Sequence, residues 1–331
     1  MMKQFIAYLS NRYSVGEDYA KAYIEYWNTH HKQLESIDDL AKLPTVESMW
    51  FDFALSANWR GRCLANALNV PMAKGGQRYL DIGAGFGGML VAFNELGYDV
   101  LGVELDPIRV GLARENLKSL RGNPSIEAGD ILDSASVGAI GKFDWITCID
   151  VIEHVASVEQ ALSNAVSLLN PGGTLVLEIP NKDAIKFVNQ DGHFALYGIT
   201  QLPRWAAIDY HSENYGFRYD VGDYYPLEFY TGLLNKLGTE VVSMFSPIQP
   251  ELSREDVLAE AKKFIAQDIE SLVNALDNCP SLVKPYLVAN LSAYQKQCSV
   301  AVNNVTHNKE SADSFLSRYG ATFWMVKATK K

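Results

Sequence analysis

The sequence predicts an α/β fold built around a doubly wound parallel sheet. From residue 78 onward, short apolar segments alternate with amphipathic helical segments, the pattern of strand–helix–strand units. A glycine-rich turn joins the first strand of this series to the first helix. Parallel strands need right-handed crossovers, so helices should cover both faces of the sheet. The predicted strands are Arg78–Ile82, Asp99–Glu104, Ser125–Ala128, Phe143–Ile149, Thr174–Ile179, Glu240–Phe245 and Thr322–Ala328.

Helical periodicity also precedes the sheet. Aromatic residues recur at helical spacing between Asp18 and His31, and a second helix is expected over Val46–Leu68. Residues 1–75 are therefore predicted to form an N-terminal helical cap, followed by a sheet domain over residues 76–331. The helices predicted between the strands are Gly87–Leu96, Pro107–Leu120, Val158–Leu169 and Leu227–Leu237.

Two insertions interrupt the alternation of strands and helices. Residues 182–226 are rich in aromatic side chains, and residues 250–318 show a helical pattern. Ser253 and Asp256 have the spacing of a capping box at the start of this second insertion. The amphipathic run from Val257 to Leu276 would bury its apolar stripe either within this chain or against a second copy in a homodimer.

Composition and charge exclude several classes of protein. The 331 residues are 48% hydrophobic and carry a formal net charge of -10, so nucleic acid is not expected as a partner. No stretch has the length and apolarity of a membrane span, and the first residues lack an export signal, so we expect a cytoplasmic protein. The cysteines are far apart and form no CxxC pair, which excludes a disulfide framework or zinc cluster: Cys63, Cys148, Cys279 and Cys298.

The glycine-rich turn is the strongest signal in the chain. Gly83, Gly85 and Gly88 follow the strand and open the helix, so the backbone can pass close to a ligand. The same spacing fits the GxGxxG pattern of nicotinamide- and flavin-binding domains, and such a match alone is weak. Asp81, two residues before Gly83, would repel a pyrophosphate but can face an ammonium group. This carboxylate favours a methionyl ligand over a dinucleotide.

Two more carboxylates follow the next strands. Glu104 ends the second strand, where it can accept hydrogen bonds from a ribose diol of either kind of cofactor. Asp130 follows the third strand and can accept from an exocyclic adenine amine, or it can simply cap the next helix.

The motifs DIGAGFGG, GVELD, GDILD, FDWITCIDVIEHV and LLNPGGTLVLEIPN, in this order, resemble the class I S-adenosylmethionine-dependent methyltransferases, in particular small-molecule O-methyltransferases of the ubiquinone-biosynthesis type. The resemblance implies a seven-stranded Rossmann-like sheet of order 3-2-1-4-5-7-6 with the last strand antiparallel. It also implies S-adenosyl-L-methionine as cofactor and S-adenosyl-L-homocysteine as product. The cofactor-binding residues that it implies are Asp81, Gly83, Ala84, Gly85, Glu104, Leu105, Asp130, Ile131, Asp150 and Val151.

By this resemblance, the glycine turn lines the methionyl group, Glu104 binds the ribose, and Asp130 with Ile131 frames the adenine. Asp150 and Val151 lie next to the methyl group to be transferred. The nicotinamide-dependent oxidoreductases remain an alternative of another class, as does a catalytically idle scaffold that retains the cofactor pocket.

Methyl transfer to a hydroxyl needs alignment and a base. His154 follows the fourth strand at the ligand-binding edge, and His193 and His211 lie among aromatic and acidic residues of the first insertion. We predict one of these three histidines as the catalytic base. We predict no metal. The alternative is a divalent ion held by Asp150, Glu153 and His154, since the segment also resembles the ExxEH stretch of small-RNA 2′-O-methyltransferases, which binds a metal together with a later histidine. His193 or His211 could be that later ligand here.

The aromatic insertion over residues 182–226 is predicted to cover the acceptor. Aromatic rings interleaved with hydrogen-bonding side chains suit a small polar acceptor with an apolar face. We expect a small-molecule acceptor, either a sugar or glycan unit or a phenol or quinone precursor. A nitrogen acceptor remains an alternative, because amines depend less on a base.

Overall fold

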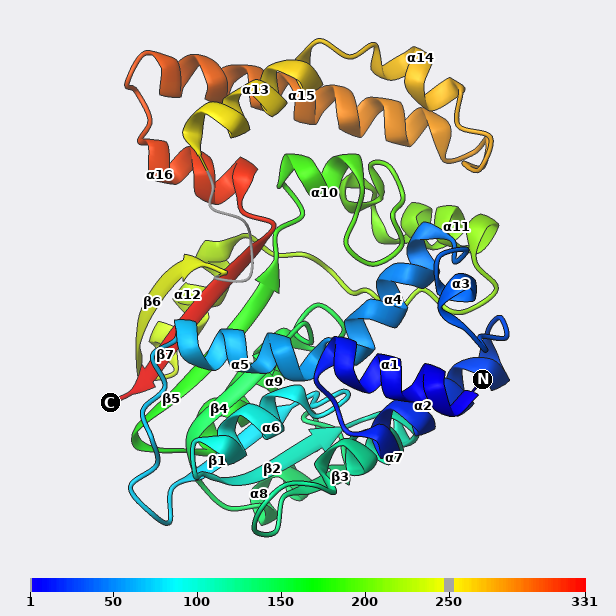
Figure 1. Ribbon diagram of the computed structural model, residues 1–331. Coiled ribbons are helices and arrows are strands. Elements are labelled where there is room, and N and C mark those ends of the chain that lie inside the picture. Colours follow the sequence, from blue (N-terminus) through cyan, green and yellow to red (C-terminus); the bar gives the residue numbers. More distant parts are fainter. Residues whose placement is uncertain (1, 247–252) are drawn as a thin grey trace.

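The computed structural model describes residues 2–246 and 253–331, and the strands among them form one seven-stranded sheet (Figure 1). The order is β3-β2-β1-β4-β5-β7-β6, with β7 antiparallel to both neighbours and the other described pairs parallel. The predicted fold class and strand order are confirmed. The strands are β1 Arg78–Ile82, β2 Asp99–Glu104, β3 Ser125–Ala128, β4 Phe143–Ile149, β5 Leu169–Pro180, β6 Thr239–Phe245 and β7 Phe323–Lys330.

Helices cover the sheet on both faces, which is why the central strands are apolar on both sides. One apolar core lies between the sheet and α9 and α12, and the other between the sheet and α6 and α7. Asp106 and Ser157 cap α7 and α9, because each side chain accepts a hydrogen bond from a backbone N–H of the first turn. The helices between the strands are α6 Gly88–Glu95, α7 Pro107–Leu117, α8 Ser134–Ala139, α9 Val158–Ser167 and α12 Leu227–Lys236.

The start of β5 differs from the prediction. The helix expected to run to Leu169 ends at Ser167, and β5 begins at Leu169 instead of Thr174. Leu169 pairs with Phe143 of β4 before a register shift, and the Gly172–Gly173 turn then leads into the regular part of the strand. The sequence pattern missed this because the pairing partner lies far away along the chain.

The N-terminal helices pack on one another and on α7. Their shared core includes Leu112 of α7, and Figure 1 shows α1 and α2 beside α7. The single helix predicted over Val46–Leu68 was wrong: the chain bends at Ser56, whose ψ is 2°, and forms two helices. These helices are α1 Met2–Tyr13, α2 Glu17–His30, α3 Ile37–Leu40, α4 Thr45–Leu55 and α5 Ala57–Ala67.

The bend at Ser56 lets α5 approach the first turn of α6 at backbone distance. A Cβ atom added to Gly61 would lie 2.3 Å from the carbonyl oxygen of Gly88, and one added to Gly88 would lie 2.1 Å from that of Ala57. Asn58 of α5 and Asn116 exchange side-chain hydrogen bonds, and Asn116 also donates to the carbonyl of Phe86 in the glycine-rich turn. The N-terminal helices are therefore held directly against that turn.

The two insertions share one apolar core and lie together above the sheet in Figure 1. Residues 250–252 of the second insertion lie outside the described residues; Ser253 accepts from the N–H of Asp256, so the predicted cap is confirmed. The apolar stripe that starts at Val257 packs inside this chain. The helices of the insertions are α10 Ile185–Asn189, η1 Ile199–Gln201, α11 Arg204–Asn214, α13 Arg254–Ile265, α14 Ile269–Asn274, α15 Lys284–Thr306, α16 Ala312–Phe315 and η2 Leu316–Gly320.

Two sequence-based expectations about composition can be compared with this fold. All four cysteines are free thiols, as expected from their spacing. Among the described helices, none is both long enough and apolar enough to cross a lipid bilayer.

Replacement of glycine by alanine should have opposite effects on stability at Gly61, in the contact between α5 and α6, and at Gly111, in an open part of α7. Gly61→Ala should lower the free energy of unfolding by about 1–3 kcal/mol, because the new methyl group meets the Gly88 carbonyl. Gly111→Ala, in α7 with open space around it, should raise that free energy by about 0.5–1 kcal/mol through helix propensity. Urea unfolding of both variants measures the two values. A stabilised Gly61→Ala variant would contradict the close contact.

Candidate functional site

The glycine-rich turn between β1 and α6 lies against the end of β4. Gly83 has a φ of +69° and Gly85 one of +51°, conformations that residues with a Cβ rarely adopt. A Cβ on Gly83 would lie 2.3 Å from the side chain of Val151, whereas only the carbonyl of Gly83 lies within 4 Å of a Cβ on Gly85. The N–H groups of Gly83 and Ala84 donate to the carbonyl of Val103, at 2.8 and 3.1 Å. A ligand over this turn would therefore meet its Cα atoms more than its amides.

Glu104 lies at the end of β2, where the sequence placed a ribose-binding carboxylate. Its Oε2 accepts from the N–H of Gly85 at 2.8 Å, and its Oε1 accepts from the N–H of Asp106 at 2.9 Å. Each carboxylate oxygen can accept a further bond, so a diol can still be held. The neighbouring Leu105 is 71% exposed, which leaves an apolar surface beside the carboxylate.

Asp81 is buried at the end of β1. Thr147 donates to its Oδ1 at 2.6 Å, and Tyr79 is hydrogen-bonded to the same threonine. Burial raises the pKa of Asp81 to about 7, because desolvation outweighs the hydrogen bonds that favour the charged form. A cation next to this carboxyl would favour its ionised form.

Asp130 and Ile131 follow β3. Asp130 is exposed, and its Oδ1 accepts from the N–H of Leu132 at 2.8 Å, so one oxygen is used in a local turn. Ile131 is buried, and its carbonyl accepts from Asn164 of α9 at 2.6 Å. The turn is thus fixed from both sides.

Asp150 directly follows β4 and has a strained conformation, with a φ of +54°. Arg60 of α5 donates to its Oδ2 at 2.7 Å, while its buried Oδ1 has no hydrogen-bond partner within the described residues. Burial raises the pKa of Asp150 against the opposing effect of Arg60. An unpartnered carboxylate oxygen at this edge is a place for a ligand cation or donor.

A further carboxyl group lies nearby on β5. Glu178 is buried and accepts a hydrogen bond from the hydroxyl of Ser246. Burial, followed by the charge of Asp150, raises the pKa of Glu178 to about 8, so this side chain is mostly a neutral acid at pH 7.

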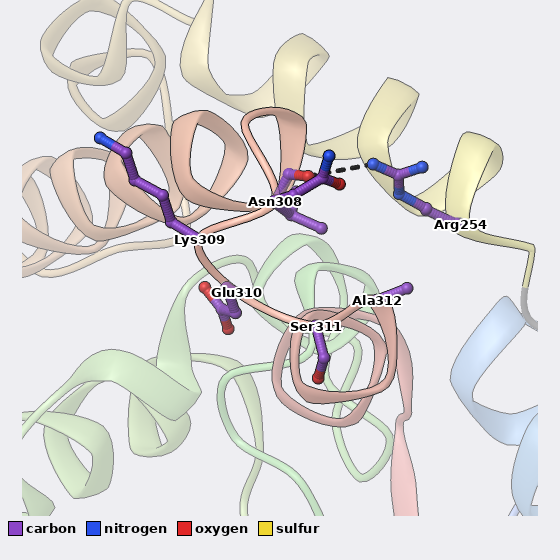
Figure 2. A pocket seen from close by; sticks show the side chains of 7 residues that line it. Arg254, Asn308, Lys309, Glu310, Ser311 and Ala312 are labelled. Atoms are coloured by element: carbon purple, nitrogen blue, oxygen red, sulfur yellow. Dashed lines mark hydrogen bonds between the residues drawn. The ribbon is translucent and has the colours of Figure 1, made fainter.

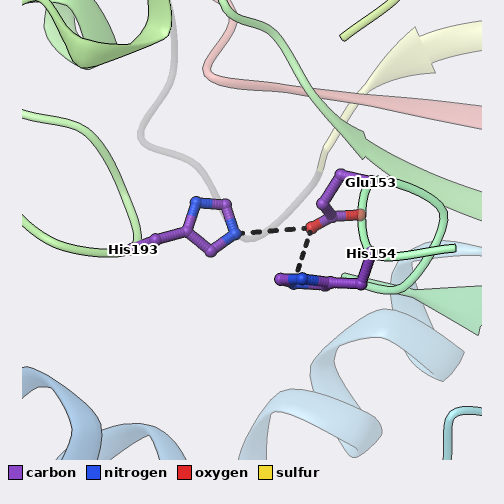
Figure 3. A group of neighbouring side chains, drawn as sticks. All are labelled: Glu153, His154 and His193. Atoms are coloured by element: carbon purple, nitrogen blue, oxygen red, sulfur yellow. Dashed lines mark ion pairs between the residues drawn. The ribbon is translucent and has the colours of Figure 1, made fainter. Parts of the chain in front are cut away.

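His154 and His193 face the same oxygen of Glu153 (Figure 3). The Nε2 atoms lie 3.8 Å and 3.6 Å, respectively, from Oε1 of Glu153. Glu153 is 1% exposed, and neither carboxylate oxygen has a hydrogen-bond partner within the described part of the chain. The Nδ1 atom of His154 lies 3.2 Å from the carbonyl oxygen of Asp220, to which it donates. The structure therefore brings together two of the three predicted histidines.

The turn that carries His193 is fixed by Asp191 and Trp50. The buried carboxylate of Asp191 accepts from the N–H groups of His193, Phe194 and Leu196, and Trp50 of α4 donates to the carbonyl of His193. Burial alone would lower the pKa of His193, but Glu153, Asp191 and Asp150 outweigh it and raise this pKa.

His211 lies elsewhere, inside α11 and fully buried. Both ring nitrogens lack a hydrogen-bond partner among the described residues, and burial lowers the pKa of the ring. Aromatic side chains surround it with centroids 4.5 to 5.4 Å away: Phe194, Tyr215, Phe217 and Tyr219.

Among the residues that the structure describes, one set of side chains has the spacing of a metal site. One ligand atom each from Glu153, His154 and His193 lies within 4.8 Å of the others. The sequence-based alternative combined Asp150, Glu153 and His154 with a later histidine, His193 or His211. Asp150 is instead bonded to Arg60, and of the two later histidines His193 is the one beside Glu153. Two imidazoles and a carboxylate would suit a divalent transition metal.

Sequence reasoning missed Arg60, Glu178 and Asp191. A glutamate inside an otherwise apolar strand was a signal for Glu178, since unpaired charges are rarely buried. Arg60 and Asp191 gave no such signal, because their partners are defined only by the fold.

Two cavities lie away from these residues. One of about 380 Å³ lies between α13 and the turn after α15, lined by Arg254, Val305 and residues 308–312 (Figure 2). Another, of about 790 Å³, lies where α6 and α7 end, at the opposite end of the sheet from Asp150. Neither is lined by any of the predicted site residues.

Comparison with known proteins gives a consistent picture. The family described as "Methyltransferase domain" matches residues 56–244, from the start of α5 into β6. A ubiquinone biosynthesis O-methyltransferase of Xanthomonas axonopodis pv. citri (strain 306) is 34% identical over 171 residues, covering 48% of this chain and 68% of that protein. One of Xanthomonas campestris pv. campestris (strain B100) is 34% identical over 113 residues; the match covers 34% of this chain and about half, 46%, of that relative. A SAM dependent methyltransferase from Archaeoglobus fulgidus has a TM-score of 0.47 and 15% identity, covering 85% of this chain and 98% of that one.

Proposed function

Because this chain belongs to the class I S-adenosylmethionine-dependent methyltransferases, we propose that it methylates a hydroxyl group of a small molecule, with His154 as the base. The observation that supports this choice is the hydrogen bond from Nδ1 of His154 to the Asp220 carbonyl. A carbonyl only accepts, so the neutral ring carries its proton on Nδ1 and a lone pair on Nε2. His193 has a carboxylate beside each ring nitrogen, Glu153 at Nε2 and Asp191 at Nδ1, and its raised pKa favours a ring that already holds a proton. His211 is enclosed by aromatic rings.

The residues at the sheet edge fit the cofactor. We assign Glu104 to the ribose diol, Asp81 to the ammonium group of the methionyl moiety, and Asp150 with its unpartnered Oδ1 to the cationic region around the sulfonium. Bound there, S-adenosylmethionine supplies an electrophilic methyl group and becomes S-adenosyl-L-homocysteine. The other residues assigned to this site are Gly83, Ala84 and Gly85 along the methionyl chain, Leu105, Asp130 and Ile131 around the adenine, and Val151 behind Gly83.

His154 and its neighbours act on the acceptor. Nε2 of His154 would take the proton of the acceptor hydroxyl as that oxygen becomes methylated, which would contribute about 10²–10⁴-fold to the rate. Glu153, beside the same nitrogen, stabilises the imidazolium that forms. Alignment by the walls of the pocket contributes the rest.

The acceptor is a small molecule under the first insertion. The cap over residues 1–75 and the cover over residues 182–226 meet through Trp50 and the His193 turn, so both line this side of the site. Acidic side chains around His154 and His193 disfavour an anionic acceptor and support a neutral polyhydroxyl or phenolic compound. The relatives named ubiquinone biosynthesis O-methyltransferase support an oxygen acceptor.

The alternative functions can be distinguished from this proposed function. Membership of the methyltransferase family excludes the nicotinamide-dependent oxidoreductase. A nitrogen acceptor would not need His154, and a metal-dependent enzyme would use Glu153, His154 and His193 together.

The assignment of Glu104 to the ribose diol predicts how a substitution changes cofactor affinity. Glu104→Ala should weaken the affinity for S-adenosylmethionine roughly ten- to a hundredfold, because charge-assisted bonds to the ribose are worth about 1.5–3 kcal/mol. Calorimetry measures this loss. Glu104→Gln retains an acceptor for the Gly85 amide and controls for collapse of the turn. Unchanged affinity in folded Glu104→Ala protein would exclude the assignment.

The assignment of Asp81 to the ammonium group predicts how cofactor binding depends on pH. Its pKa of about 7 in the free protein means that the ionised carboxylate, which attracts the ammonium group, becomes dominant as pH rises through neutrality. Affinity for S-adenosylmethionine should therefore increase between about pH 6 and about pH 8. Asp81→Asn should remove this increase. A flat profile for the wild-type protein in calorimetry would count against the ammonium assignment.

The proposed role of His154 as the base predicts the outcome of turnover assays, which use a labelled methyl donor and a panel of hydroxylated small molecules. His154→Ala should lower kcat about 10²–10⁴-fold with cofactor affinity retained. His211→Phe keeps a ring in the aromatic cage and serves as a control with little change. EDTA should leave the wild-type rate unchanged; loss on chelation with recovery by Mn²⁺ or Mg²⁺ would replace the histidine base by a metal.

A further inference from the structure

Residues 220–222 of the first insertion touch the turn after β4 through their backbone. The N–H of Gly222 donates to the carbonyl of Glu153 at 2.6 Å. A Cβ on Gly222 would lie 2.8 Å from that same oxygen and 3.6 Å from the carbonyl of Val155. Because both are backbone atoms, no side chain can turn aside to make room. Only glycine allows this approach.

The same approach brings the carbonyl of Asp220 to His154. Nδ1 of His154 lies 3.2 Å from this carbonyl oxygen, while the carboxylate Oδ2 of Asp220 is more distant at 3.8 Å. The carbonyl has no proton to give, so Nδ1 must be the protonated nitrogen in the neutral ring. A free histidine has no such constraint on its tautomer.

We propose that Gly222 is a positioning residue for methyl transfer: its contact with Glu153 seats the Asp220 carbonyl on Nδ1 of His154 and leaves Nε2 as the proton acceptor. This inference rests on the proposed role of His154 as the base. It adds that the insertion, besides covering the acceptor, selects the reactive form of the catalytic ring. A displaced segment would leave His154 in place but in a mixture of tautomers.

The test compares two glycines of the same segment. Gly222→Ala pushes the segment away from Glu153. Gly216→Ala is the matched control, because beyond its chain neighbours no described residue lies within 4 Å of the new methyl group. Nitrogen-15 spectra of the histidines are recorded at about pH 9, above the ordinary titration range of imidazole, with assignment through His154→Gln. His154 should carry its proton on Nδ1 in the wild type and in Gly216→Ala. In Gly222→Ala a large fraction should move to Nε2.

Turnover gives the second readout. Gly222→Ala should lower kcat about 10²-fold, as expected for a displaced catalytic group, with the acceptor KM and the cofactor affinity within a few-fold of wild type. Gly216→Ala should match the wild type. Equal turnover of the two variants would overturn the proposal.

A third variant separates the carbonyl from the carboxylate. Asp220→Ala keeps the backbone carbonyl, so the proton should stay on Nδ1; its transfer to Nε2 in this variant would overturn the role of the carbonyl. The spectra need neither cofactor nor acceptor. A wild-type His154 protonated on Nε2 thus refutes this inference even if Gly222→Ala fails to fold, whereas wild-type protein without any methyl transfer refutes the proposed function.

Discussion

The backbone contact between α5 and α6 is the constraint on which the site depends. Gly61 and Gly88 let the two helices meet at a distance that no side chain would permit. Arg60, the residue before Gly61, is thereby placed where its guanidinium reaches Asp150. From the preceding helix, Trp50 holds the turn of His193. The glycine contact thus fixes the N-terminal helices against the glycine-rich turn, and Arg60 and Trp50 extend this to the end of β4 and to the His193 turn.

The site concentrates carboxyl groups that would repel one another if all were charged and unpaired. Asp150, Glu153 and Glu178 lie at the ends of neighbouring strands and interact electrostatically. Three features reduce the repulsion between these carboxyl groups. Arg60 pairs with Asp150, Glu178 is largely protonated near neutral pH, and the raised pKa of His193 favours its positively charged form. The remaining unpartnered oxygens, on Asp150 and Glu153, are the ones left to interact with ligands.

The sequence predicted what local pattern determines. β1, β2, β3 and β4 begin and end at the predicted residues, because the alternation of strands and helices and the glycine turns mark them. For the same reason, Asp81 lies near the end of β1 and Glu104 at the end of β2, as predicted. The bend at Ser56, the early start of β5 and the Arg60–Asp150 pair depend on partners far away in the chain, and local pattern carries no information about them. His193 and His211 also have similar sequence surroundings, yet one lies beside Glu153 and the other inside a ring cage. Only the packing of the insertion distinguishes them.

The separation of roles between sheet and insertion explains why the cofactor could be inferred more readily than the acceptor. The carboxylates that we assign to the cofactor come from strand ends, whose positions the sheet fixes. Apart from Glu153, the groups around His154 belong to the first insertion: His193 and the Asp220 carbonyl. Their placement depends on how the whole insertion packs, including the backbone contact at Gly222. A substitution in the insertion would therefore alter the shape of the proposed acceptor pocket or the orientation of the proposed base without disturbing the glycine-rich turn. Under the proposed function, acceptor choice would be encoded in the insertion, which is the least regular part of the chain, where specific contacts matter more than the fold.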